Sequence, residues 1–269
     1  MGMNIERSIA VDRSLINGKI DEYLDTHWDD IVADIDTLVR IPSVEELDKA
    51  EEGAPYGPGP RAALNAALDM ASSMGFEVHD DQGHIGYADL PGQTQGQIGI
   101  IGHMDVVPAG PGWTFEPYQV TRKDGYLIGR GVIDDKGPSV VALHAMKFWK
   151  DLQDEGVAEQ FPYTVRFLFG ANEETGMADV AYYRQRHDDP LFLFTPDAEF
   201  PVCYGEKGLY DGFITVPMSE SGRIVEFDGG VASNAVPGQA HAVVRAEASA
   251  LPAAEGIAVA PAGEGLVRI

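Results

Sequence analysis

Residues 100–108 read Ile-Ile-Gly-His-Met-Asp-Val-Val-Pro, an apolar run that ends in a histidine and a carboxylate two positions apart. The apolar part predicts a strand inside a sheet. Residues i and i+2 of a strand point to the same face, so Asp105 can hold the ring of His103. Such a contact fixes which ring nitrogen of the histidine is free to bind a metal ion.

Three acidic motifs follow along the chain: Asp134-Asp135-Lys136-Gly137, Glu173-Glu174-Thr175-Gly176 and Pro196-Asp197-Ala198-Glu199. Each is expected at the carboxyl end of a strand or in the loop after it, the edge of an α/β sheet where ligands bind. Taken singly, each motif fits a turn, a helix cap or a solvated face. Their joint occurrence favours a hydrolase in which His, Asp and Glu ligands hold a catalytic metal ion.

The composition narrows the classes of partner. The chain has 269 residues, 44% of them hydrophobic, which is enough for a large core or two domains. Its formal net charge of -24 argues against nucleic acid or an anionic membrane as a partner. The single cysteine, Cys203, can form no internal disulfide, which fits a cytoplasmic protein. We see neither a membrane-spanning stretch nor a signal peptide.

Apolar periodicity predicts alternating helices and strands as far as residue 195. Helices are expected over 28–39 with Thr26 as N-cap, over 61–74, from Pro138 to about 156, and over 178–187. Strands are expected near 76–79, 84–89, 97–102, 126–130, 165–169 and 191–195, the last two buried on both faces. This alternation predicts an α/β fold with a mixed, largely buried sheet and helices on both faces.

The pattern changes after residue 207. Strands with Gly and Pro turns are expected over 208–217, 222–227 and 241–247, without clearly alternating helices. We therefore predict two domains, residues 1–207 and residues 208–269, the second being the start of a smaller α+β domain.

Longer stretches carry a resemblance to a known family. They are residues 102–110 (Gly-His-Met-Asp-Val-Val-Pro-Ala-Gly) with 112–114, residues 129–138, and residues 195–201 with 206–208. The sequence resembles the two-zinc metallopeptidase and deacylase family that includes carnosinase, aminoacylase and acetylornithine deacetylase, and within it the bacterial dipeptidase V type. The resemblance covers roughly residues 28–245. It implies a zinc exopeptidase-like catalytic domain over 1–207 and part of a lid, or dimerisation-type, domain over 208–269.

The resemblance also implies the ligands of two Zn²⁺ ions. His103 and Asp197 would bind one ion, Glu174 would bind the second, and Asp134 would bridge both. In the family the second ion needs a further histidine from near the C-terminus of a longer chain. No remaining histidine of this chain has that context, so we expect a truncated chain in which one metal site lacks a ligand.

Three more residues receive roles from the same motifs. Glu173 would be the general base that activates the water, and Asp105 would orient His103. Asn234, in Ser233-Asn234-Ala235-Val236-Pro237, resembles a residue of the family's lid that contacts the substrate.

The expected activity is zinc-dependent hydrolysis of dipeptides or other short peptides in the cytoplasm. One alternative is an N-acyl-amino-acid deacylase of the same family. Another is a non-catalytic, truncated fragment that binds one zinc ion or none. The sequence context of residues 197–201 and 206–208 favours the dipeptidase branch. Oligomerisation stays open, because some relatives dimerise through the lid.

Overall fold

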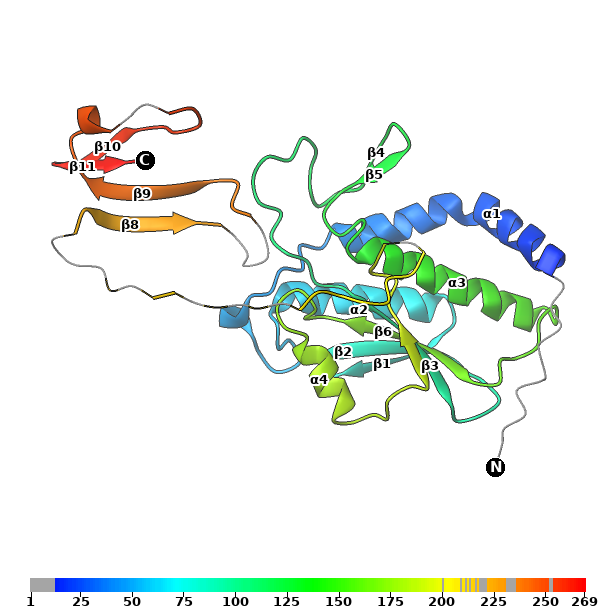
Figure 1. Cartoon of the computed structure of the whole chain (residues 1–269). Helices are drawn as coiled ribbons and strands as arrows, with labels where there is room; N and C mark the ends of the chain where they lie inside the picture. Colours follow the sequence, from blue (N-terminus) through cyan, green and yellow to red (C-terminus); the bar gives the residue numbers. More distant parts are fainter. Residues whose placement is uncertain are drawn as a thin grey trace. The chain divides into compact units, whose positions relative to one another are not determined.

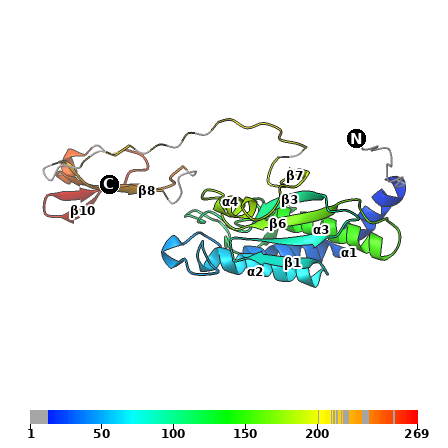
Figure 2. The same cartoon turned by 90° about the horizontal axis from the view of Figure 1, so that it is seen from below.

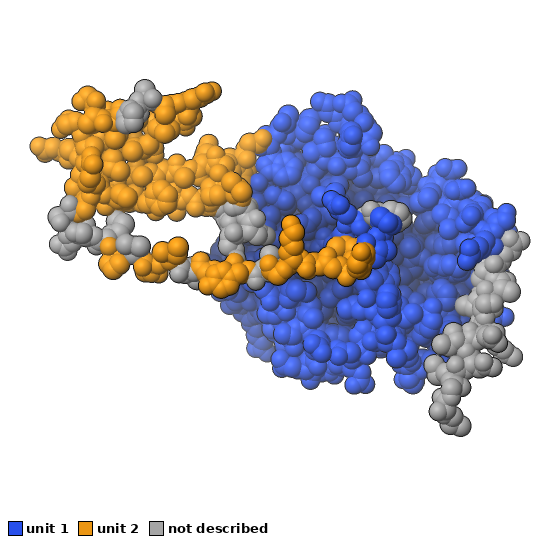
Figure 3. Space-filling view, viewed as in Figure 1, with its two compact units in different colours: residues 1–109, 113–202 blue, residues 110–112, 203–269 orange. Residues whose placement is uncertain are grey.

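The computed structural model describes residues 13–199, 201–208, 210, 212, 214, 215, 217, 222–230, 236–251 and 254–269. The chain divides into two compact units (Figure 3). The first comprises residues 1–109 and 113–202, and the second comprises residues 110–112 and 203–269. The assignment of residues 208–269 to a lid domain stays a prediction.

Five strands of the first unit form one mixed sheet in the order β1-β2-β6-β3-β7 (Figure 1). They are β1 (Glu77–Asp81), β2 (Ile85–Leu90), β6 (Thr164–Gly170), β3 (Gln97–His103) and β7 (Phe192–Phe194). β3 runs parallel to β6 and β7, whereas β2 is antiparallel to its two neighbours. His103 pairs with Gly170 in the register of β3 and β6, so these two strands end side by side.

Helices cover both faces of this sheet, as the sequence predicts (Figures 1 and 2). α1 (Arg13–Val39), α2 (Pro58–Ser73) and α3 (Lys136–Asp154) form the main core with one face, and the short α4 (Ala178–Arg184) packs on the other. Within β6, Phe167 and Phe169 belong to the main core, whereas Leu168 packs with Tyr183 of α4. The alternation follows from the period of two residues in a strand.

The first helix differs from its prediction. α1 begins at Arg13, so Thr26 lies inside the helix and is not its N-cap; its hydroxyl donates to the carbonyl of Glu22. The apolar residues of this stretch do not mark one buried face, because Leu15 and Leu24 are exposed. Contact with α3 explains the extension, since Ile16 packs in a cluster with Phe148. α3 likewise begins at Lys136, which puts Pro138 in its first turn.

The prediction that residues 191–195 form a strand buried on both faces is wrong. β7 pairs with β3 at the edge of the sheet, and no other strand in the described part of the chain pairs with it. Phe192 is 59% exposed and Phe194 is 45% exposed. The apolar run therefore identified a strand but not its position, because a strand at the edge and one at the centre can share a composition.

The remaining elements of the first unit are small. They are the 3-10 helix η1 (Leu47–Lys49) and a hairpin of β4 (Thr121–Lys123) and β5 (Tyr126–Ile128).

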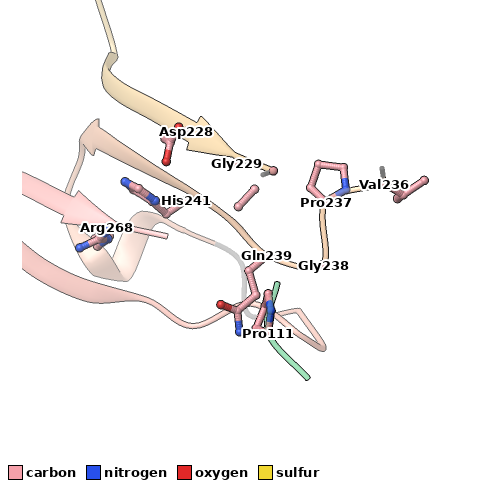
Figure 4. A pocket seen from close by; sticks show the side chains of 11 residues that line it. Pro111, Asp228, Gly229, Val236, Pro237, Gly238, Gln239, His241 and Arg268 are labelled. Atoms are coloured by element: carbon pink, nitrogen blue, oxygen red, sulfur yellow. The ribbon is translucent and has the colours of Figure 1, made fainter. Parts of the chain in front are cut away.

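The second unit contains an antiparallel sheet in the order β10-β11-β9-β8. Its elements are β8 (Ile224–Gly229), β9 (Ala240–Arg245), η2 (Ala248–Ala250), β10 (Ala260–Gly263) and β11 (Leu266–Arg268). β8 and β9 correspond to two predicted strands, whereas the described residues among 208–217 form none. Asp228, His241 and Arg268 line a hollow of this sheet (Figure 4). Asn234 lies outside the described residues.

Candidate metal centre

The centre is built around His103, the last residue of β3. Its ring is buried, and Nδ1 lies 3.0 Å from the main-chain oxygen of Asp105 and 3.3 Å from Oδ1 of the same residue. Both neighbours are hydrogen-bond acceptors, so Nδ1 carries the hydrogen. Nε2 is then the ring nitrogen that a cation can bind once its proton is displaced.

Carboxylates surround the free ring nitrogen. Nε2 of His103 lies 3.0 Å from Oδ1 of Asp134, 3.5 Å from Oδ2 of Asp197 and 3.9 Å from Oε2 of Glu173. Ligand atoms of His103, Asp134 and Glu174 all lie within 4.8 Å of one another. Acidic groups gathered this closely repel one another unless a cation lies between them. One imidazole nitrogen with several carboxylate oxygens is a donor set that fits Zn²⁺.

His103 and its acidic neighbours shift one another's pKa. Burial on its own lowers the pKa of His103, but hydrogen bonds with Asp105, Asp134 and Asp197 outweigh it and raise the pKa well above its ordinary value. The bond to His103 lowers the pKa of Asp134. A cation that binds Nε2 must therefore displace a proton held by these carboxylates.

Two buried neighbours fix Asp134 between β3 and α3. Oδ2 of Asp135 accepts hydrogen bonds from the main-chain N–H of His103 (3.1 Å) and from the hydroxyl of Ser139 (2.9 Å). Lys136 is fully buried, and Nζ donates to the carbonyls of Leu38 (2.9 Å) and Ile41 (2.8 Å) at the end of α1. Sequence reasoning singled out Asp134 and missed the contribution of these neighbours, although they belong to the same motif.

Asp105 forms more hydrogen bonds than the sequence predicted. Besides its contact with His103, its Oδ1 accepts from the main-chain N–H of Glu173 (3.2 Å) and its Oδ2 from that of Glu174 (3.1 Å). One buried carboxylate therefore connects the histidine with both glutamates. Oε1 of Glu174 also accepts from the main-chain N–H of Val107 (3.3 Å), which directs this side chain toward the loop after β3.

The structure brings six predicted site residues together where three parallel strands end and where α3 begins, the position of Asp134. β3 contributes His103 and the loop after it, β6 precedes the glutamate pair, and β7 precedes Asp197. The six residues are His103, Asp105, Asp134, Glu173, Glu174 and Asp197. This is the edge at which α/β sheets bind ligands.

Fold and site together define an α/β protein with a histidine–carboxylate cluster that could hold a metal ion. The model of the family described as "Peptidase family M20/M25/M40" matches residues 99–263. The chain therefore belongs to this family of peptidases, and the resemblance stated from the sequence is confirmed.

Individual proteins show the same relationship. The chain is 34% identical over 220 residues to the "Beta-Ala-Xaa dipeptidase" of Lactobacillus delbrueckii subsp. lactis, covering 80% of this chain and 46% of the relative. Among solved structures it is similar to human carnosine dipeptidase 1, with a TM-score of 0.50 and 25% identity over 61% of this chain and 36% of that one. The chain thus spans about half the length of the curated relatives it matches.

Proposed function

We propose that the protein hydrolyses the amide bond of dipeptides or other short peptides with the help of two Zn²⁺ ions. The observation that carries this proposal is the convergence of His103, Asp134 and Glu174 within 4.8 Å, with Glu173 directly beside them. The two relatives described above are both dipeptidases by name, which supports the substrate class.

The proposal assigns each candidate ligand to one or both of the ions. His103 and Asp197 would hold one ion, Glu174 would hold the other, and Asp134 would be a ligand of both. When bound, the ions polarise the substrate carbonyl and acidify a water molecule. Asp105 keeps the proton on Nδ1 of His103, so that Nε2 stays available as a ligand.

Glu173 has the position of a proton carrier. Its carboxylate lies 3.9 Å from Nε2 of His103, and its side chain is 41% exposed, so water and substrate can reach it. It would accept a proton from the attacking water and pass it to the leaving amine. Asp105 holds its main chain and that of Glu174, which keeps the proton carrier beside the ligand.

The two adjacent glutamates allow a test with a matched pair of variants. In Glu173→Gln we expect dipeptide turnover to fall about 10²–10⁴-fold, because the proton acceptor is lost while the ligands remain. In Glu174→Gln we expect less bound zinc as well as less turnover. The measurements are dipeptide hydrolysis and zinc content of the same purified sample.

The outcomes separate the assignments. Full turnover in Glu173→Gln contradicts its role as the base, and full zinc content in Glu174→Gln contradicts its role as a ligand. Turnover of N-acetyl amino acids in place of dipeptides by the unaltered chain would favour the deacylase.

We also propose that the protein acts in the cytoplasm, which the lone, exposed Cys203 supports. None of the described helices is long and apolar enough to cross a bilayer.

A further inference from the structure

The short segment between α1 and η1 lies against the loop that carries His103 and Asp105. The fully buried Ser43 donates from its hydroxyl to the carbonyl of Met104 at 2.6 Å. The carbonyl of Ser43 in turn accepts from the main-chain N–H of Val106 at 3.1 Å. Residues 104 and 106 are thus held on each side of Asp105.

The same segment also reaches the loop that carries Glu173 and Glu174. Two residues after Ser43, Oε1 of Glu45 accepts a hydrogen bond from the side-chain amide of Asn172 at 2.7 Å. Asn172 is 3% exposed and directly precedes the glutamate pair. One segment therefore contacts both halves of the metal centre.

The other polar groups of Asn172 form hydrogen bonds within the loop that carries Glu173 and Glu174. Its Nδ2 also donates to the hydroxyl of Thr175 (2.6 Å), and its Oδ1 accepts from the main-chain N–H of Ala178 (3.1 Å). Its carbonyl accepts from the main-chain N–H of Met177 (2.8 Å). A side-chain amide has two N–H donors, so both are used, one inside the loop and one toward Glu45.

We propose that Glu45 and Asn172 are positioning residues that set the place of Glu173 and Glu174 relative to His103. Asp105 anchors the glutamates from the side of β3, and the Glu45–Asn172 bond is a second anchor on a different segment. Neither residue belongs to the group of His103, Asp134 and Glu174 that could hold the ion; each acts through the loop. Only the consequence for turnover rests on the proposed function, because an effect on metal binding needs no substrate.

Substitutions at Glu45 give the sharpest test. Glu45→Ala removes the acceptor, whereas Glu45→Gln keeps an oxygen that can accept from Asn172. Glu46→Ala is the matched control: the neighbouring glutamate pairs with Lys49 on the surface. Thr175→Val, at an exposed position, removes the second acceptor of the Asn172 amide and provides an independent route.

The readouts are zinc affinity in competition with a chromophoric chelator, the absorption spectrum of bound Co²⁺, and the melting temperature. In Glu45→Ala we expect zinc affinity to fall about tenfold or more and the Co²⁺ spectrum to change, as when an outer contact of a metal site is lost. In Thr175→Val we also expect zinc affinity to fall and the Co²⁺ spectrum to change. Glu45→Gln and Glu46→Ala should bind zinc like the unaltered chain.

Unchanged zinc affinity and Co²⁺ spectrum in Glu45→Ala would overturn the positioning role, even if the melting temperature fell. If Glu45→Ala did not fold, the same unchanged readouts in Asn172→Asp, which removes the donor to Glu45 and keeps the acceptor for Ala178, would overturn it. A chain that binds zinc as expected but hydrolyses no dipeptide would count against the proposed function and leave the positioning role intact.

Discussion

Asp105 shows what residue-level reasoning can and cannot reach. Its contact with His103 was predictable, because alternate residues of an extended chain share a face. Its bonds to the main chain of Glu173 and Glu174 were not, because they depend on the parallel pairing of β3 with β6. The candidate ligands could be proposed from the sequence because each motif is local, whereas the contacts that hold the motifs together join distant parts of the sequence.

Because Asp105 contacts both His103 and the two glutamates, we expect its substitution to lower zinc affinity. In Asp105→Asn we expect zinc affinity to fall about tenfold to a hundredfold, because an amide cannot accept all the hydrogen bonds that converge on the carboxylate. Zinc competition titration measures the change. Asp34→Asn is the matched control, since Asp34 forms an aspartate–histidine contact with His144 at 2.8 Å, away from the centre. Equal zinc affinity in the two variants would contradict the prediction.

At the scale of elements, the strands of the first sheet were easier to predict than their positions in it. The strand expected over 97–102 is β3 (Gln97–His103), because its apolar run is short and ends at a polar motif. The start of α1 was missed because its contacts are with α3, more than a hundred residues away. The edge position of β7 was missed for a similar reason, since strand order is a property of the whole sheet.

The contact between β3 and α3 leaves no room for a side chain at Gly102. A Cβ there would lie 2.0 Å from the hydroxyl oxygen of Ser139 and 2.5 Å from Oδ2 of Asp135. We expect Gly102→Ala to lower the free energy of unfolding by about 1–3 kcal/mol, as in overpacked cores. It should also weaken zinc binding, because Asp135 holds the main chain of His103.

Urea denaturation and zinc titration check both effects. The control is Gly96→Ala, just before β3, where the new Cβ would meet the tip of the exposed, flexible Leu191 side chain. A Gly102→Ala chain as stable as the Gly96→Ala chain would show that the contact between β3 and α3 is looser than described.

For the whole molecule, the main exposed apolar feature of the sheet is β7. An edge strand with unpaired main-chain groups and exposed aromatic rings favours pairing with another chain. We expect the chain to self-associate as its concentration rises, and Phe192→Lys to reduce this, because a charge on an edge strand opposes pairing. Sedimentation velocity over a range of concentrations measures the association.

Tyr126→Lys serves as the comparison, because Tyr126 is 72% exposed but lies on β5, outside the main sheet. If both substitutions lowered self-association equally, net charge and not the edge of β7 would be the cause.

The segment between α1 and η1 has a consequence for recombination among relatives. The family model begins at residue 99, yet Ser43 and Glu45 contact the loops of the metal centre, and Lys136 binds the carbonyls of Leu38 and Ile41. A crossover that joined the first 98 residues of one relative to the remainder of another would exchange these contacts as a set. Such chimeras should keep all the metal ligands of the second parent and still differ from it in how firmly the ligands are held.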